Sequence, residues 1–94
     1  MHYVYVLRSL GGNGKWYIGC TADLRTRTVL HQNGRVLATK GKGPWERVYY
    51  EAYRRQTDAF QRERSLKQFG GAYRQLRKRL ARECQFASST ESRN

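Results

Sequence analysis

Two polar side chains fall on the face of one expected helix that should turn toward the core. Arg27 and His31 follow the apolar Leu24 by three and seven positions, so all three share one helical face. A buried arginine is costly unless it meets an anion. The pair therefore indicates a site for an anionic group. The alternatives are an arginine whose stem packs along the core edge and a hydrogen-bonded histidine at a helix end.

A single glutamate interrupts the apolar stripe of a second expected helix. Glu63 stands four residues after Ala59 and three before Leu66, where an alanine or leucine would be expected. Magnesium usually takes one or two protein carboxylates and completes its octahedron with waters and phosphate oxygens. Because the chain holds only seven acidic residues, we favour a metal-anchoring role over the alternative, an ion pair with a nearby arginine.

Tyrosines are concentrated near the start of the chain, on an expected β-hairpin. Tyr5 and Tyr17 would be cross-strand neighbours in one of the possible registers. A phenol with a pKa near 10 is a poor base at neutral pH, but a nearby arginine or metal ion would lower that pKa. Aromatic packing on the sheet explains most of the seven tyrosines, and spacing alone does not single one out.

The elements that must position these side chains are indicated by β-branched, aromatic and turn residues. Gly11 to Gly14 is a strong turn signal, so the strands around it should form an antiparallel hairpin. Thr21 is expected to cap the first helix, and residues 34–44, with three glycines and the only proline, should form a loop. In chain order, we expect strands at 3–7 and 16–19, a helix at 22–32, a strand at 47–53 and helices at 58–69 and 72–84.

This order predicts an α/β chain of the α+β type: a small three-stranded antiparallel sheet flanked by helices, in the order β-β-α-β-α-α. The length of 94 residues fits one domain, which we place at residues 1–84, followed by a polar tail at 85–94 that we expect to be disordered. The start of the chain lacks the features of a signal peptide, and Cys20 and Cys84 are expected to be free thiols. We therefore expect a cytoplasmic protein.

The charge of the chain indicates an anionic partner. Nineteen Lys and Arg against seven Asp and Glu give a net charge of +12, an excess that repels itself in the compact state. Nucleic acid is the leading candidate, because phosphate contacts release condensed counterions, whereas no apolar run is long enough to cross a membrane. The residues expected to grip a nucleic acid backbone are Arg35, Lys40 and Lys42 in the loop and Arg74, Arg77 and Lys78 in the last helix.

The same residues form an ordered pattern that resembles the GIY-YIG nuclease superfamily, most closely its small stand-alone bacterial members. The pattern consists of Tyr3-Val4-Tyr5, Tyr17-Ile18-Gly19, Asp23-Leu24, Arg27, His31 and Glu63. It departs from the family at two points: the first motif lacks the namesake Gly and Ile, and the region after the glutamate helix lacks an Asn that some members carry.

The resemblance implies a metal-dependent endonuclease that hydrolyses DNA phosphodiester bonds, as in DNA repair. By this resemblance Tyr5 or Tyr17 activates the attacking water, Arg27 stabilises charge on the phosphoryl oxygens, and His31 assists proton transfer. Glu63 holds Mg²⁺ or Mn²⁺, and Gly19 allows close backbone approach. Because no separate targeting domain is visible, we expect cutting that is structure-selective or directed by a protein partner. The alternative is a non-catalytic module that retains the fold and binds DNA or RNA through its charge and stacked tyrosines.

Overall fold

The computed structural model describes the backbone of residues 1–11, 15–68 and 70–91, and the side chains of these residues up to 80. Its elements are β1 (His2–Ser9), β2 (Trp16–Thr21), α1 (Leu24–Gln32), β3 (Trp45–Tyr53), α2 (Gln56–Gln68) and α3 (Gly70–Glu91). The predicted fold class and order, β-β-α-β-α-α, are confirmed. None of the helices in the described ranges is long and apolar enough to cross a membrane.

β1 is the central strand of an antiparallel sheet with the order β2-β1-β3. Residues 3–7 of β1 are apolar or aromatic on both faces, as expected for a strand that is covered on two sides. Tyr5 of β1 stands opposite Gly19 on one side and opposite Tyr50 on the other. β2 therefore forms one edge of the sheet, and its outer side is not paired with another strand of the described chain.

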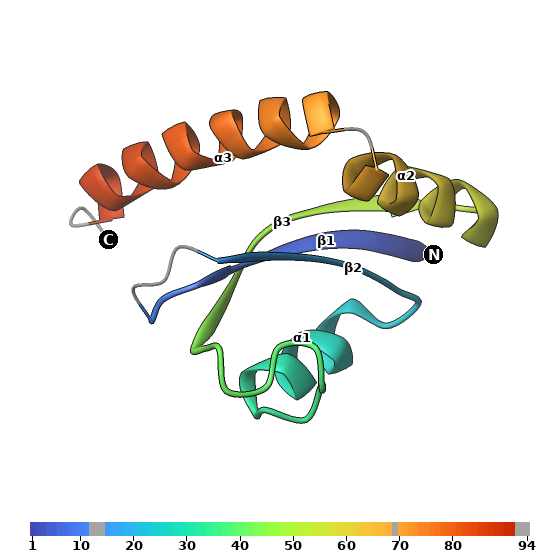
Figure 1. Cartoon of the computed structure of the whole chain (residues 1–94), viewed down its shortest axis with the longest axis horizontal. Coiled ribbons are helices and arrows are strands. Elements are labelled where there is room, and N and C mark those ends of the chain that lie inside the picture. The colour runs from blue at the N-terminus through green and yellow to red at the C-terminus, as the bar shows by residue number, and fades with distance from the viewer. Residues whose placement is uncertain (12–14, 69, 92–94) are drawn as a thin grey trace.

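Helices cover both faces of the sheet, with α2 and α3 on one face and α1 on the other (Figure 1). Side chains alternate along β1 between these two layers. Val4 and Val6 pack with residues of α2 and α3, including Leu66 and Leu80. Tyr5 and Leu7 belong instead to a second, smaller cluster with Trp45. This second face carries most of the side chains that the sequence singled out.

The first helix begins two residues later than predicted, and its cap is a different residue. The side chain of Asp23, and not that of Thr21, accepts from the backbone N–H of Thr26. Asp23 occupies the cap because Thr21 is the last residue of β2 and its hydroxyl accepts from the N–H of Asp23. The helix nevertheless presents the expected face to the sheet.

The last helix runs from Gly70 to Glu91, so the helical backbone continues past the predicted end at about Cys84. The helical backbone includes residues 85–91 of the expected tail, whose disorder stays a prediction, and residues 92–94 lie outside the described part of the chain. Few of these residues oppose a helix strongly, and a long helix already precedes them. The placement of a domain boundary at residue 84 stays a prediction.

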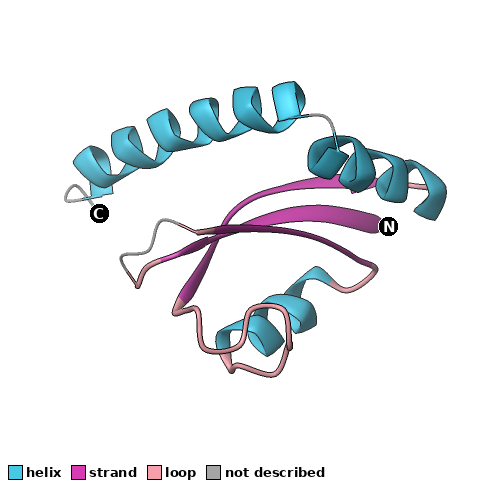
Figure 2. Cartoon of the chain, viewed as in Figure 1, coloured by secondary structure: helices cyan, strands magenta, loops and turns pink. Residues whose placement is uncertain are grey.

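The loop between α1 and β3 folds back beside α1 on the same face of the sheet (Figure 2). The indole N–H of Trp45 donates to the carbonyl oxygen of Thr39 at 3.0 Å, which ties the middle of the loop to the start of β3. Thr39 is 2% exposed, although neighbours such as Lys40 are exposed. The loop thus supplies a buried hydroxyl to the layer that contains α1.

Candidate active site

Three buried side chains form a hydrogen-bonded chain beneath the sheet. The hydroxyl oxygen of Tyr5 lies 2.7 Å from Nε2 of His31, and Nδ1 of His31 lies 2.7 Å from Oγ1 of Thr39. The Thr39 hydroxyl donates to the carbonyl oxygen of Val36 at 3.4 Å. Its oxygen is then left to accept from Nδ1 of His31, so we infer that Nε2 accepts the proton of Tyr5.

Gly19 makes room for the phenol of Tyr5. The two residues face each other across the β1–β2 ladder, and a Cβ at Gly19 would collide with the hydroxyl and ring of Tyr5. Only glycine leaves that space empty, so the Tyr5 side chain crosses the neighbouring strand and reaches His31. The group that approaches the Gly19 backbone closely is therefore the Tyr5 side chain of the same sheet.

Burial sets the protonation of the tyrosine–histidine pair. Burial raises the pKa of Tyr5 to about 12, although the hydrogen bond and charge of Arg27 act in the opposite direction. Burial, followed by the charge of Arg27, lowers the pKa of His31 to about 4. Both side chains are therefore neutral at pH 7. For Tyr5 this differs from the expectation that a neighbouring arginine lowers the pKa, because the loss of hydration outweighs the nearby positive charge.

Arg27 lies one helical turn before His31 and is half-buried. Its Nε is buried and has no hydrogen-bond partner among the described residues. A buried donor without a partner costs free energy, and such groups are rare in folded proteins. The guanidinium therefore has bonding capacity that the fold itself does not use, next to the Tyr5 hydroxyl.

Tyr17 lies between this buried chain and the open edge of the sheet. It stands opposite Leu7 in the ladder, so Tyr5 and Tyr17 are diagonal neighbours and not a direct pair. Its ring centre is 6.3 Å from that of Tyr5 and 5.0 Å from that of His31. Unlike Tyr5, Tyr17 is only half-buried. It is thus the tyrosine of the cluster that solvent reaches.

The second helix layer reaches the same edge through an ion pair. Nζ of Lys67 lies 5.8 Å from the ring centre of Tyr17 and 3.1 Å from Oε2 of Glu63. The charge of Glu63 acts on Tyr5, and it also adds to the effect of burial in raising the pKa of Cys20. Glu63 therefore lies close to β2 although it belongs to α2, and the site wraps around the edge of the sheet.

A divalent cation at this edge would find Glu63 as its one carboxylate among the described residues of the cluster. No group of three or more His, Cys, Asp and Glu side chains gathers in the portion of the chain that the structure describes. The Glu63 side chain is 23% exposed, and its Oε2 already holds the ammonium of Lys67. A magnesium or manganese ion held by one carboxylate, waters and phosphate oxygens would suit this arrangement.

The expected site residues separate into one cluster and two basic groups. The cluster brings together Tyr5, Tyr17, Arg27, His31 and Glu63, with Gly19 beside it. The loop group, Arg35, Lys40 and Lys42, is exposed and lies in the layer of α1. The helix group, Arg74, Arg77 and Lys78, lines a cavity with Trp16 on the opposite face. The two basic groups therefore do not form one continuous surface around the cluster.

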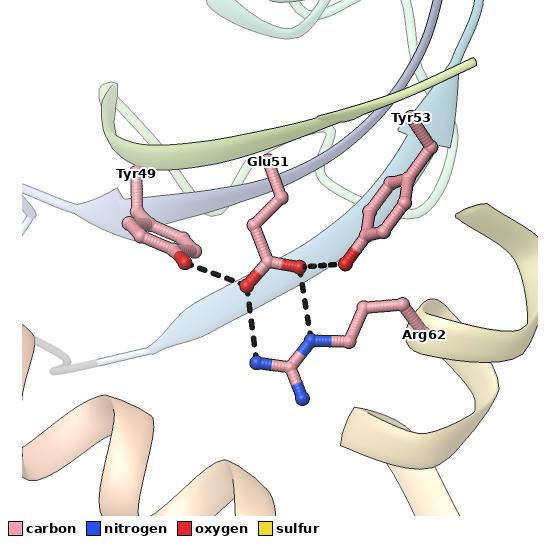
Figure 3. A network of polar contacts seen from close by, with 4 residues as sticks. All are labelled: Tyr49, Glu51, Tyr53 and Arg62. Carbon is pink, nitrogen blue, oxygen red and sulfur yellow. Dashed lines mark hydrogen bonds and ion pairs between the residues drawn. The ribbon is translucent and has the colours of Figure 1, made fainter. Parts of the chain in front are cut away.

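A further polar network ties α2 to β3 (Figure 3). The carboxylate of Glu51 accepts from the hydroxyls of Tyr49 at 2.6 Å and Tyr53 at 2.5 Å. It also accepts from Nε and Nη2 of Arg62 at 2.9 and 3.0 Å. Arg62 directly precedes Glu63, so this network fixes the helix that carries the candidate metal anchor.

Three residues of this region had no predicted role, namely Thr39, Lys67 and Glu51. Thr39 contacts His31 only because the loop folds back under the sheet, which no local spacing reveals. Lys67 could have been found, because a glutamate followed four residues later by a lysine predicts an ion pair on a helix. Glu51 stands among alternating aromatic residues of a strand, and that alternation indicates that it shares a face with Tyr49 and Tyr53.

The kind of domain follows from the similarity of this chain to known families. Residues 1–78 match the GIY-YIG catalytic domain. The chain belongs to the GIY-YIG family. Its relatives include a UPF0213 protein of Staphylococcus epidermidis, 33% identical over 69 residues that span 72% of this chain and 82% of the relative. A UPF0213 protein of Oceanobacillus iheyensis is 35% identical over 68 residues, spanning 71% and 77%.

The fold of this GIY-YIG protein has a counterpart of known structure. The solution NMR structure of the UPF0213 protein BH0048 from Bacillus halodurans matches with a TM-score of 0.52 and 30% sequence identity. The match covers 84% of this chain and 83% of the other. The family resemblance stated from the motifs is thereby confirmed, and it associates the chain with nuclease activity and a nucleic acid substrate.

Proposed function

We propose that this GIY-YIG protein is an endonuclease that cleaves DNA by metal-dependent hydrolysis of phosphodiester bonds. One observation carries the proposal: Tyr5, Tyr17 and His31, from three different elements, meet within hydrogen-bonding or ring-contact distance at one edge of the sheet. Arg27 joins them from α1 and Glu63 from α2. A module that only binds nucleic acid has no need of a carboxylate here, because a carboxylate repels phosphate.

Arg27 stabilises the charge that develops on the phosphoryl oxygens. Its guanidinium is held in place by α1 on one side and by the Tyr5 hydroxyl on the other. A fixed cation in a partly buried site stabilises a developing negative charge more strongly than mobile water does. The unpartnered Nε of Arg27 supports this role, because the fold leaves part of the guanidinium without an internal partner.

Tyr17 orients the attacking water, and Tyr5 acts through His31. Tyr17 is the half-buried tyrosine at the open edge, whereas Tyr5 is 1% exposed and has a pKa raised to about 12. Tyr5 is therefore a poor proton acceptor in the resting site. The chain from Tyr5 through His31 to Thr39 holds the imidazole ring against Tyr17 and assists proton movement at its Nε2.

Glu63 holds the metal ion, with Mg²⁺ or Mn²⁺ as the candidates. When bound, such an ion supplies Lewis-acid stabilisation of the phosphoryl and leaving-group oxygens. When no ion is bound, Lys67 neutralises Glu63, since the Lys67 ammonium lies 3.1 Å from Oε2 of Glu63. The network of Glu51 and Arg62 orients α2 so that Glu63 faces the edge of the sheet.

The substrate is proposed to be DNA that is recognised by structure or presented by a protein partner. The exposed basic residues of the loop and of α3 contact phosphates, and such contacts carry no base specificity. We also propose that the protein acts in the cytoplasm, in DNA repair.

Arg27→Ala tests the proposal against a matched change on the same helix. Purified protein is incubated with end-labelled single-stranded, duplex and branched DNA, with magnesium or manganese. Wild-type protein should cut at least one of these substrates, and Arg27→Ala should lower the rate by about a hundredfold or more.

Arg25→Ala is the control, because this substitution removes the same charge from an exposed position of α1. It should leave the rate within a few-fold of wild type. Tight binding of DNA without cleavage of any substrate, with either metal, would move the assignment to a binding module. Equal losses in the two variants would show that only the net charge matters.

A further inference from the structure

A cavity lies on the α3 side of the sheet, beside the candidate active site but not part of it. Its volume is about 540 Å³, and it is lined by Trp16, Gly70, Tyr73, Arg74, Arg77 and Lys78. A smaller cavity of about 280 Å³ shares Trp16 and Tyr73 with it and continues to Tyr17 and Lys67. The two cavities together form a groove that connects the edge of the candidate site with the first turns of α3.

The side chains of this groove are of two kinds. Trp16 and Tyr73 are half-buried aromatic rings. Among the described residues, the remaining large side chains of the wider cavity are cationic, namely those of Arg74, Arg77 and Lys78, and no carboxylate lines it. A polyanion with flat aromatic groups has the complementary chemistry, because phosphates pair with the cations and bases stack on the rings.

A planar group already lies against both rings. The guanidinium carbon of Arg77 lies 5.2 Å from the ring centre of Trp16 and 5.9 Å from that of Tyr73. The ring faces are therefore accessible to a flat, polarisable group from the side of α3. A base can take this position while Arg77 turns toward the neighbouring phosphate, since arginine both stacks and pairs with phosphate.

We propose that Trp16 and Tyr73 form a stacking site for one unpaired base of the bound DNA strand, next to the phosphate that is cleaved. The inference rests on the proposed function in that it takes the strand to be DNA. A base within a continuous duplex is stacked on both sides and does not enter the site without being turned out. The groove therefore selects substrates with an unpaired nucleotide beside the scissile bond, such as single strands, flaps and branch points.

The test is a binding measurement in EDTA, which does not depend on cleavage. Fluorescence anisotropy gives the Kd of the full chain for a labelled single-stranded oligonucleotide and for a set of copies that each carry one abasic position. In wild-type protein at least one abasic position should weaken binding about tenfold. Trp16→Leu should weaken binding of the intact oligonucleotide by about the same factor, and the abasic position should then have no further effect.

Two further variants separate stacking from packing. Trp16→Phe keeps an aromatic ring and should retain binding within about threefold of wild type. Phe60→Leu removes an exposed aromatic of α2 that lines neither cavity, and it should change nothing. The abasic series in wild-type protein requires no variant, so the inference stays testable if Trp16→Leu does not fold.

The inference is overturned if no abasic position weakens binding to wild-type protein, or if the abasic loss persists unchanged in Trp16→Leu. If the protein still cleaves DNA normally, either result would reject the stacking site and leave the nuclease proposal standing. Position-dependent abasic losses that vanish in Trp16→Leu, in a protein that cuts no DNA, would reject only the nuclease proposal.

Discussion

His31 is fixed on both sides of its ring. Its two nitrogens lie 2.7 Å from the oxygens of Tyr5 and Thr39, and only 1% of the residue is exposed. A ring held in this way keeps one tautomer and one orientation, and charging it requires that a proton displace one of these bonds. The same environment that prepares His31 for proton transfer therefore makes its protonation costly to the fold.

Acid should destabilise the protein through His31. Its pKa is about 4 in the folded state, below the ordinary value of 6.5, so the unfolded chain binds the extra proton as the pH falls from 6.5 toward 4. Its contribution to stability is full above pH 6.5 and lost on acidification through this window, by up to about 3 kcal/mol. Urea unfolding at pH 7.0 and 5.0 measures the difference.

The control for this prediction is His31→Gln, which has no group that titrates in the window. Its stability should depend on pH less steeply than that of wild type between pH 7.0 and 5.0. The same pH dependence in both proteins would contradict the burial of a neutral imidazole.

At the scale of elements, α2 is attached to the sheet by a carboxylate with three partners. Burial raises the pKa of Glu51, but the bonds from Arg62, Tyr49 and Tyr53 outweigh it and keep the pKa below its ordinary value. The ionised carboxylate is thus the form that the fold binds. Because Arg62 and Glu63 are adjacent, the orientation of the candidate metal anchor depends on this attachment (Figure 3).

Glu51→Gln should destabilise the protein by roughly 2–4 kcal/mol, because it leaves Arg62 partly buried without its counter-charge. It should also lower the cleavage rate, since α2 is no longer fixed to β3. Thermal or urea unfolding gives the first quantity and a DNA cleavage assay the second.

Glu46→Gln is the matched control on the same strand. Glu46 pairs with Arg8 at 2.6 Å, but its side chain is 46% exposed, so loss of that pair should cost no more than about 1 kcal/mol. Equal losses in the two variants would show that the Glu51 network is no more important than a surface ion pair.

The elements were more predictable from the sequence than the contacts between them. The order of strands and helices followed from β-branched runs, glycine turns and the spacing of Leu24, Arg27 and His31 along α1. The pairing of Tyr5 with Gly19, and the placement of Tyr17 opposite Leu7, did not follow, because a hairpin register is set by its turn and by packing on both faces. Thr39 escaped prediction for a similar reason, since its contact with His31 depends on how the loop folds back.

The pKa of Tyr5 shows why site chemistry was only partly predictable. Its proximity to Arg27 could be expected from the family pattern, and proximity alone favours a lowered pKa. The outcome depends on the depth of burial, which a sequence gives only coarsely, and here burial dominates.

At the scale of the whole molecule, the chain carries a net charge of +12, and described basic side chains lie on both faces of the sheet. The basic residues of α3 lie beside the proposed stacking groove, while those of the loop lie in the opposite layer. DNA that follows the groove is expected to contact the α3 group directly.

DNA affinity should fall by tenfold or more between 50 and 200 mM salt, because bound phosphates release counterions. For single strands, the slope of the logarithm of the binding constant against the logarithm of the salt concentration should become shallower in the double variant Arg74→Gln/Lys78→Gln, by about 0.7 for each contact removed. The control, Arg54→Gln/Arg55→Gln, removes the same charge between β3 and α2 at exposed positions and should leave the slope nearly unchanged. Equal reductions in both would contradict a local contact at α3.

The most direct test of the account compares two carboxylates of α2 in single-turnover DNA cleavage with magnesium or manganese. Glu63→Gln removes the candidate metal anchor, and Asp58→Asn removes an exposed acidic side chain from the first turn of the same helix. We predict that Glu63→Gln lowers the rate by about a hundredfold or more while DNA binding in EDTA is retained, and that Asp58→Asn cuts like wild type. Cleavage by Glu63→Gln at the wild-type rate would contradict the assignment of Glu63 and the metal-dependent chemistry built on it.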